Sequence, residues 1–310
     1  MNSNDKLIIV AGPTASGKTK FAIELAKRNN AVLINADSRQ VYKYMDIGTN
    51  KGILTAKNQA INVEVSGRRK FQLREYEVEK SGVSGYMFDI VRPDETFSLS
   101  DFQSLSKYLI NFFSKLNQKL IFVGGTGLYI DALIRNIKLP DVKPNDLLRN
   151  KLRKLSREQL YDELYGLDEA EARNLNASDR SNSRRLIRRI EIATSGKDLK
   201  GKSGSVNYQL YYPLINRSEL YEKINLRVEQ MFDEGLIDEV KHLKKMGYEK
   251  VKPMQGMGYK EVIAFLNDDL NLQEMKDKIK QAHRNYSARQ MTWFEGVGRG
   301  YDLTKVDYSC

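Results

Sequence analysis

Apolar and polar residues alternate along the first third of the chain in a pattern that predicts strands separated by helices. Short apolar runs at residues 7–10 and at Ala31–Asn35 are typical of buried strands, and residues 119–123 form a third such run. Between the first two runs, the apolar residues of Lys18–Asn29 recur at helical spacing. Strands that alternate with helices favour a doubly wound parallel sheet, so we predict an α/β fold.

Residues 61–78 follow a different pattern, because apolar and polar positions alternate there with a period of two. A polar, basic turn at residues 66–69 interrupts this alternation in the middle. Such a pattern predicts a β-hairpin with an exposed turn. The sequence assigns the hairpin no role, and a solvated loop is the interpretation that we adopt.

The chain changes character after Lys138, where Pro140 and Pro144 break the preceding pattern. Helical spacing then returns at residues 146–164, and shorter helices are expected at residues 169–175 and 182–193. These three helices do not alternate with strands. We therefore predict a helical insertion that interrupts the α/β core.

The expected organisation is a P-loop parallel-sheet core with a helical insertion domain. Its predicted bounds are residues 1–137 and 204–310 for the core and residues 138–203 for the insertion. Within the second part of the core, residues 206–294 predict one strand followed by helices.

The charge balance of the 310-residue chain is basic, with 51 Lys and Arg against 40 Asp and Glu. The net charge of +11 favours a polyanionic partner such as nucleic acid. The only cysteine is Cys310, which excludes an internal disulfide and a cysteine-based zinc site and fits a reducing cytoplasm. No apolar run reaches the ~18 residues of a membrane span, so we expect a cytoplasmic protein without membrane contact. His242 and His283 are too far apart in sequence to suggest a metal centre, and we expect both on helix surfaces.

The pattern G-x-x-x-x-G-K-T follows the first apolar run and leads into the first predicted helix, which is the context that a phosphate-binding loop requires. Gly12 and Gly17 allow successive backbone N–H groups to turn toward an anion, while the helix N-terminus and Lys18 add positive charge. Thr19 offers a hydroxyl where Mg²⁺ would bind. The expected polyphosphate- or diphosphate-binding residues are Gly12, Pro13, Thr14, Ala15, Ser16, Gly17, Lys18 and Thr19.

Two further segments end predicted strands and should reach the same edge of the sheet as this loop. They are residues 37–40 and residues 124–126. Phosphate-loop enzymes usually place an acidic residue at the end of a later strand for the Mg²⁺ shell, but here that end reads Gly-Gly-Thr. Asp37 is the acidic residue that does end a strand. Its carboxylate could serve a metal ion, take a proton from an acceptor, or cap a helix with help from Ser38.

Five motifs together resemble the tRNA dimethylallyltransferase family, also called tRNA isopentenyltransferases. They are GPTASGKT at 12–19, DSRQVY at 37–42, FVGGTGLY at 122–129, PMQGMGYKE at 253–261 and ARQMTWF at 288–294. The likeness runs from Leu7 to Phe294 with the motifs in the family's order. An end shortly after the last motif resembles bacterial members, which lack the zinc finger of longer eukaryotic ones.

The resemblance implies transfer of a dimethylallyl group from its diphosphate to N6 of the adenosine at tRNA position 37, beside the anticodon. Asp37 would take the proton from N6, and Thr126 would hydrogen-bond near the reacting centre. The phosphate-binding loop, with Mg²⁺ at Thr19, would stabilise the departing diphosphate. Arg217 is a further candidate contact to the diphosphate, with a surface ion pair as the alternative. We expect Mg²⁺ as the cofactor and a monomeric protein.

The resemblance also implies contacts to the anticodon stem-loop, at the acceptor cleft and in the helical insertion. The helix at residues 182–193 carries four arginines that share one face, with only Glu191 as an acidic neighbour. The alternative for this helix is a solvated charged face. Position 184 is usually Gln in the family, so Arg184 is expected to contact a phosphate rather than a base. The expected tRNA contacts are Asp37, Ser38, Arg39, Gln40, Thr126, Arg149, Arg184, Arg185 and Arg188.

The residues alone are also compatible with two other functions. One is a P-loop kinase acting on a nucleoside or another small metabolite, in which the arginine helix would close over phosphates as a lid. The other is a noncatalytic RNA-binding module in which the phosphate-binding loop is only structural. Incubation with bulk tRNA and labelled dimethylallyl diphosphate, in parallel with ATP, separates the three.

Overall fold

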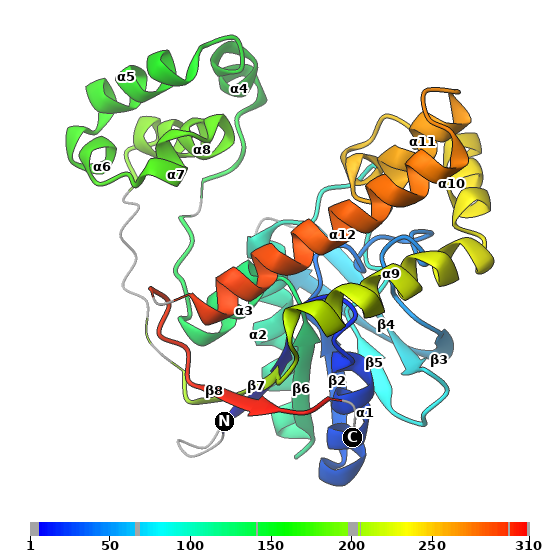
Figure 1. Ribbon diagram of the computed structural model, residues 1–310. Coiled ribbons are helices and arrows are strands. Elements are labelled where there is room, and N and C mark those ends of the chain that lie inside the picture. Colours follow the sequence, from blue (N-terminus) through cyan, green and yellow to red (C-terminus); the bar gives the residue numbers. More distant parts are fainter. Residues whose placement is uncertain are drawn as a thin grey trace. The chain divides into compact units, whose positions relative to one another are not determined.

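The chain forms two compact units. The computed structural model describes residues 6–65, 69–140, 142–197, 204, 206–296 and 298–308. Contacts group Met1–Ile134 with Val206–Cys310 in the first unit and Arg135–Ser205 in the second (Figure 1). The predicted insertion at residues 138–203 falls inside the second unit.

An eight-stranded sheet lies at the centre of the first unit (Figure 1). Its strands are β1 (Leu7–Ala11), β2 (Ala31–Asn35), β3 (Leu54–Val65), β4 (Arg69–Val78), β5 (Ser84–Tyr86), β6 (Lys119–Gly124), β7 (Tyr208–Pro213) and β8 (Leu303–Val306). The order across the sheet is β3-β4-β5-β2-β6-β1-β7-β8. The strands from β5 to β8 in this order are parallel, whereas β4 and β3 are antiparallel to their neighbours. The predicted α/β fold with a parallel sheet is confirmed, and β8 is a strand that the sequence pattern did not indicate.

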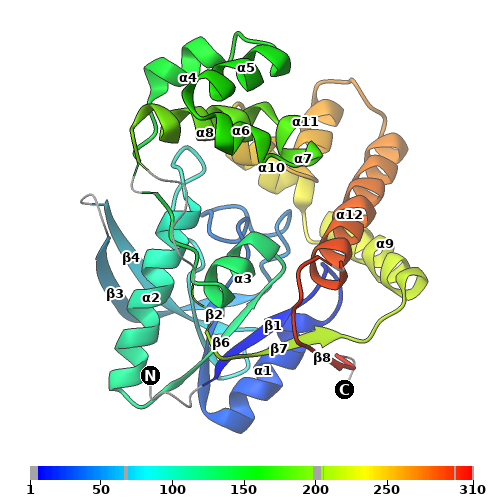
Figure 2. The same cartoon turned by 90° about the vertical axis from the view of Figure 1, so that its left-hand side faces the viewer.

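Both faces of the parallel part of the sheet are covered by helices (Figure 2). Val10 and Leu33 pack with the residues of α1, whereas Ile9 and Ile34 pack on the opposite face with those of α2 and α3. Burial on both faces explains why these strands read as continuous apolar runs. The helices of this unit are α1 (Lys18–Asn29), α2 (Leu99–Lys115), α3 (Gly127–Ile134), α9 (Arg217–Asp233), α10 (Leu236–Lys245), α11 (Tyr259–Leu266) and α12 (Leu272–Glu295), with a 3₁₀ turn at Lys252–Gln255.

The hairpin expected at residues 61–78 is present but belongs to the sheet. Strand β4 pairs with β5, and β3 pairs with β4 from Leu54 onward, with a bulge between Ala56 and Ala60. Val63 and Leu73 are buried in the same core as α2. The interpretation as a solvated loop is therefore wrong for the described strands, while the turn at residues 66–68 lies outside the described residues.

The helices from α9 to α12 build a second core next to the sheet. Val228, Val240, Val262 and Ile279, one from each of these helices, pack together with Met45 from the loop that follows β2. This packing ties that loop to the C-terminal helices. None of the helices in the described ranges is both long and apolar enough to cross a membrane.

The second unit consists of short helices around its own apolar core, which includes Leu160, Leu164, Leu186 and Ile190. The single helix expected at residues 146–164 is two helices, because Ser156 caps a new one and forms a capping box with Gln159. The helices are α4 (Asp146–Leu152), α5 (Arg157–Leu167), α6 (Glu169–Arg173), α7 (Ala177–Arg180) and α8 (Ser183–Thr194).

His283 is buried on α12, which corrects the expectation that it lies at the surface, whereas His242 on α10 is exposed. Within the described part of the chain, Nε2 of His283 and Nε of Arg227 are buried without a hydrogen-bond partner. Burial and the neighbouring charge of Arg227 lower the pKa of His283 from 6.5 to about 4. The folded protein therefore keeps this imidazole neutral where an exposed histidine takes up a proton.

We predict that His283 makes the first unit acid-sensitive. Between pH 6.5 and about pH 4 the unfolded chain binds a proton that the folded chain excludes, so stability falls as pH falls through this range. The shift corresponds to at most roughly 3 kcal/mol. The His283→Leu variant should lack this loss. Unfolding by urea at several pH values, followed by the fluorescence of Trp293, the only tryptophan, measures the difference. Parallel pH profiles for the two proteins would contradict the prediction.

Candidate active site

The phosphate-binding loop connects β1 to α1 and is supported by the C-terminal segment. Gly17 has a φ of 85°, and a Cβ added there would lie 3.1 Å from the backbone carbonyl of Tyr308. The hydroxyl of Tyr308 donates a hydrogen bond to the carbonyl of Ala11 at 3.0 Å. Position 17 thus requires glycine both for its left-handed backbone and for this close approach.

The loop holds groups that suit an anion. Nζ of Lys18 lies 3.4 Å from the carbonyl of Pro13. Burial lowers the pKa of Lys18, and the nearby charge of Asp37 opposes this effect. The hydroxyl of Ser16 is buried and has no hydrogen-bond partner among the described residues, so an anion could satisfy it. By contrast, the N–H of Thr14 is already bonded to Oε1 of Gln290 at 3.0 Å.

The donor set fits Mg²⁺ carried mainly by a phosphate ligand. Among the described residues, no group of three or more His, Cys, Asp or Glu side chains could hold a metal ion. The hydroxyl of Thr19, in the first turn of α1, makes no hydrogen bond within the same residues. Mg²⁺ commonly keeps several waters and takes other oxygens from substrate phosphates, and the hydroxyl of a phosphate-loop Ser or Thr is one protein ligand that it uses, so Thr19 could hold it together with a diphosphate.

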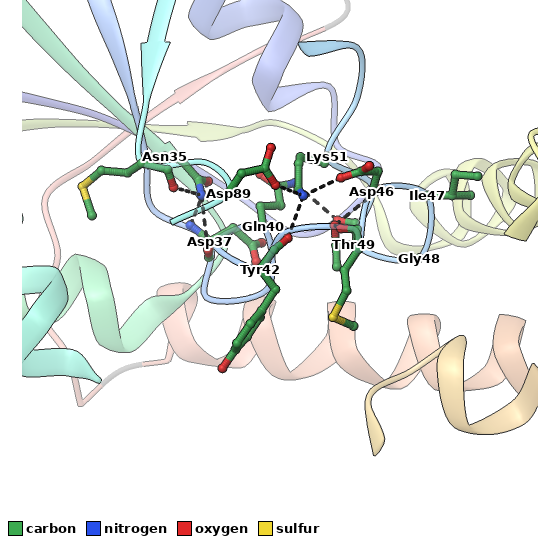
Figure 3. A network of polar contacts seen from close by, with 12 residues as sticks. Asn35, Asp37, Gln40, Tyr42, Asp46, Ile47, Gly48, Thr49, Lys51 and Asp89 are labelled. Carbon is green, nitrogen blue, oxygen red and sulfur yellow. Dashed lines mark hydrogen bonds and ion pairs between the residues drawn. The ribbon is translucent and has the colours of Figure 1, made fainter. Parts of the chain in front are cut away.

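Asp37 follows β2 and is held by a local turn. Asn35 anchors this turn, because its Oδ1 accepts from the N–H of Asp37 at 3.1 Å and its Nδ2 donates to the carbonyl of Met87 at 3.0 Å (Figure 3). Oδ1 of Asp37 accepts from the N–H of Arg39 at 2.8 Å. No helix begins here in the described chain, so the helix-cap alternative is wrong. Oδ2 has no hydrogen-bond partner among the described residues and can receive one from a ligand.

Thr126 joins the end of β6 to the same turn. Its Oγ1 accepts from the N–H of Ser38 at 2.9 Å and donates to Oγ of Ser38 at 3.2 Å. Tyr286 of α12 lies near Thr126. Burial, followed by the charge of Asp37, raises the pKa of Tyr286, so its hydroxyl stays protonated. The two expected catalytic residues, Asp37 and Thr126, therefore lie on loops that hydrogen-bond to each other.

A buried lysine closes the longer loop from residue 37 to residue 51. Nζ of Lys51 donates to the carbonyl of Tyr42 at 2.8 Å and lies 2.5 Å from a carboxylate oxygen of Asp46 and of Asp89 (Figure 3). In the same loop, Nε2 of Gln40 donates to the carbonyl of Asn50 at 2.8 Å. Gln40, an expected tRNA contact, is thus engaged within the protein. Arg39, another expected contact, is exposed.

Glu239 of α10 anchors this loop from the other side. Its carboxylate accepts from the N–H groups of Asp46, Ile47 and Gly48 at 2.9, 2.7 and 3.1 Å. It also accepts from the hydroxyl of Tyr259 at 2.7 Å, which gives the motif at residues 253–261 a structural role. Sequence analysis missed Glu239, Lys51 and Tyr286. Glu239 and Tyr286 act on residues distant in the chain, and Lys51 also reaches Asp89, 38 residues away. None of the three lies within the five motifs.

The arginines of the second unit are paired more fully than expected. Glu191 is buried and accepts from Nε and Nη2 of Arg149 at 2.7 and 2.8 Å and from Arg188 at 3.1 Å. Burial opposes ionisation of Glu191, but the hydrogen bonds from Arg149, from the N–H of Asn145 and from Arg188 outweigh it and lower its pKa. Arg149, an expected tRNA contact, therefore helps to hold α4 against α8, whereas Arg188, another expected contact, bonds Glu191 within α8 and donates to the carbonyl of Val142 at 2.9 Å.

Glu191 is not the only acidic neighbour of these arginines, contrary to expectation. Asp179 pairs with Arg185 at 2.7 Å and with Arg189 at 2.9 Å. Arg189 also pairs with Glu171. Arg184 is exposed, and its guanidinium has no partner within the described residues.

Arg217 begins α9, shortly after the end of β7. Its Nε donates to the hydroxyl of Tyr221 at 2.8 Å, and the described residues show no ion pair to it. The ring of Pro213, the last residue of β7, lies against Gly12 of the phosphate-binding loop. The structure thus starts α9 near the loop, and the predicted contact of Arg217 with the diphosphate stays a prediction.

The geometry brings the phosphate-binding loop, Asp37 and Thr126 to the carboxyl ends of three neighbouring strands, β1, β2 and β6. The expected insertion contacts, Arg149, Arg184, Arg185 and Arg188, lie together in the second unit. The residues expected to carry the chemistry and those expected to bind RNA outside the cleft therefore belong to different units.

Comparison with known proteins gives the same family throughout. Residues 74–297 match the family described as IPP transferase, and residues 5–83 match isopentenyl transferase. The chain is 38% identical over 297 residues to a tRNA dimethylallyltransferase of Anoxybacillus flavithermus, covering 94% of this chain and 87% of the relative. It is 38% identical over 311 residues to one of Clostridioides difficile, covering 97% and 93%.

Solved structures agree with this relationship. A tRNA isopentenylpyrophosphate transferase of Bacillus halodurans superposes with a TM-score of 0.65 at 34% identity, covering 98% of this chain and 90% of that one. A tRNA delta(2)-isopentenylpyrophosphate transferase of Staphylococcus epidermidis gives 0.64 at 30% identity, with 98% and 94% covered. The chain belongs to the tRNA dimethylallyltransferase family.

Proposed function

We propose that this protein transfers a dimethylallyl group from dimethylallyl diphosphate to N6 of the adenosine at tRNA position 37. The observation that carries the proposal is the arrangement at one edge of the sheet, where the neighbouring parallel strands β1, β6 and β2 lead into the phosphate-binding loop with Lys18, into Thr126 and into Asp37. A loop that can bind the leaving diphosphate then lies near a carboxylate that can take a proton from the acceptor amine. Family membership supports the same reaction and disfavours the kinase and noncatalytic alternatives.

The reaction needs stabilisation of the leaving diphosphate and removal of a proton from the acceptor amine. As the allylic C–O bond breaks, its electron pair leaves with the diphosphate, and the backbone amides of the loop and Lys18 stabilise that charge. Bound at Thr19, Mg²⁺ would supply further charge neutralisation. The N6 lone pair forms the new C–N bond, and Asp37 takes the proton that N6 releases. Thr126, held by the N–H of Ser38, would hydrogen-bond beside the reacting amine.

The partner is proposed to be the anticodon stem-loop of tRNA, whose target base must leave its stack to reach the site. Arg184 and Arg185 are the cations of α8 best placed for phosphates, since Arg184 is unpaired among the described residues and Arg185 is about half exposed, at 48%. Arg149 would act mainly by holding α4 against α8, and Arg188 by fixing the segment before α4 through the carbonyl of Val142. A monomer in the cytoplasm is the state in which we expect the protein to act.

Removing the charge or the hydroxyl of the phosphate-binding loop should abolish transfer. We predict that Lys18→Ala and Thr19→Ala lose activity with labelled dimethylallyl diphosphate, while tRNA binding by filter retention stays within about threefold. The matched control is Lys20→Ala, because Lys20 is exposed in the same first turn of α1. Near-normal turnover of either variant at saturating donor and Mg²⁺ would refute the role of the loop.

Asp37→Asn separates proton transfer from positioning. The amide oxygen can still accept from the N–H of Arg39 and so preserve the turn, but an amide cannot take the proton. General-base catalysis contributes typically ~10²–10⁴-fold, so kcat should fall by that amount with little change in KM for the donor. Asp94→Asn, at an exposed site, serves as control. A variant within about threefold of wild type would leave Asp37 as a turn residue only.

Arg184 and Arg185 test the second unit. The double change to Ala should weaken tRNA binding and reduce the slope of log K against log salt by somewhat under one unit for each phosphate that the protein no longer neutralises. Affinity for dimethylallyl diphosphate should not change. The control removes two exposed charges elsewhere in the unit, with Lys154→Ala and Arg157→Ala. If the control pair weakens tRNA binding as much as the test pair, α8 has no special part in RNA binding. If the test pair leaves tRNA binding unchanged, its arginines form only a solvated face.

A further inference from the structure

Helix α12 directs two polar side chains toward the site, one helical turn apart. Gln290 is only 5% exposed, and Tyr286 precedes it by four residues, so both project from one face of the helix. Tyr286 lies near Thr126, and Gln290 hydrogen-bonds two different loops. These bonds leave the helix for loops that follow strands, so they do not serve α12 itself.

The side-chain amide of Gln290 joins the phosphate-binding loop to the loop that follows β6. Its Oε1 accepts from the N–H of Thr14 at 3.0 Å, and its Nε2 donates to the carbonyl of Gly125 at 2.9 Å. A Cβ added at Gly125 would overlap this Nε2, so only glycine allows the approach. One planar group thus fixes the spacing between the two loops.

The loop after β6 is hydrogen-bonded in turn to the loop that carries Asp37. The N–H of Thr126 donates to the carbonyl of Ala36 at 3.4 Å, and its hydroxyl accepts from the N–H of Ser38 at 2.9 Å. Asp37 lies between these two anchored residues. A path of hydrogen bonds and short backbone segments therefore leads from the phosphate-binding loop through Gln290 to the acceptor carboxylate.

We propose that Gln290 is a positioning residue for the transfer, which holds the phosphate-binding loop and the acceptor loops at the separation that the reaction needs. The inference rests on the proposed function, because this separation matters only if a group moves from one side to the other. Gln290 acts through Thr14 and Gly125 rather than on a substrate. Displacing the reacting atoms by about 1 Å can cost roughly 10²-fold in rate, so loss of the bridge should appear mainly in kcat.

Gln290→Met keeps the length of the side chain and removes both hydrogen bonds. We expect kcat to fall by roughly 10²-fold, with KM for dimethylallyl diphosphate and for tRNA within about threefold of wild type. The matched control is Gln103→Met, because Gln103 is also buried, at 7% exposed, and also donates to a backbone carbonyl, that of Ala132. The control should lose similar thermal stability and keep kcat within about threefold.

Gln290→Glu gives a sharper test. A protonated carboxyl has one donor and one acceptor like the amide, whereas a carboxylate has no donor for the carbonyl of Gly125. Burial favours the protonated form, so activity relative to wild type should rise as pH falls from about 8 to about 6. Gln290→Met should show no such recovery. The ratio to wild type removes the contribution of nearby charged and titratable groups common to both proteins, namely Lys18, Asp37, Arg39, Tyr286 and Arg289.

The proposal is overturned if kcat of Gln290→Met stays within about threefold of the control, or if its loss of activity comes wholly from a higher KM for the donor. A Gln290→Glu protein whose relative activity does not rise at low pH also overturns it, even where Gln290→Met does not fold. No transfer by the wild-type protein would overturn the proposed function itself. If the wild-type protein transfers the group and Gln290→Met is equally active, only the role of Gln290 is overturned.

Discussion

The parallel pairing of β2, β6 and β1 is the constraint on which the candidate site depends. Parallel neighbours end at the same edge of a sheet, so the loops that follow them must meet there. The pairing continues beyond the strands, because the N–H of Ala36 donates to the carbonyl of Val123 at 2.8 Å. Asp37 is the next residue on the β2 side. The sheet register therefore sets where the carboxylate of Asp37 lies relative to the phosphate-binding loop.

The sequence was sufficient wherever short-range rules decide the structure. The bounds of α1 and β2 agree with those predicted, because a glycine-rich turn and a continuous apolar run leave few alternatives. The same local chemistry identified the loop at residues 12–19 and the strand-end position of Asp37. The hairpin was recognised from its alternation, but its burial was not, since alternation shows that one face is apolar without showing what covers it. In the structure, β5 pairs with the hairpin and α2 packs against its apolar face.

The rest of the site depends on pairs that are distant in the chain. Gln290 and Thr14 are 276 residues apart, and Glu239 binds the N–H of Ile47, which is 192 residues away. A polar residue in an amphipathic helix gives the same local signal whether it faces solvent or a buried backbone group. For that reason the sequence did not predict the burial of His283 or the ion pairs of the arginines on α8. The sequence predicts a surface position for His283, which is buried, and nearly free arginines on α8, which are mostly paired.

The two units use positive charge differently. In the second unit, most arginines of α4 and α8 have carboxylate partners, so their guanidinium groups already have a defined arrangement before any RNA arrives. In the first unit, burial lowers the pKa of Lys18, and the opposing charge identified near it is that of Asp37. A desolvated cation interacts strongly with an anion that enters the same low-dielectric space. The fold holds Lys18 in place through supports of its loop such as Tyr308 and Gln290, and a diphosphate bound as proposed would meet the charge of Lys18 there.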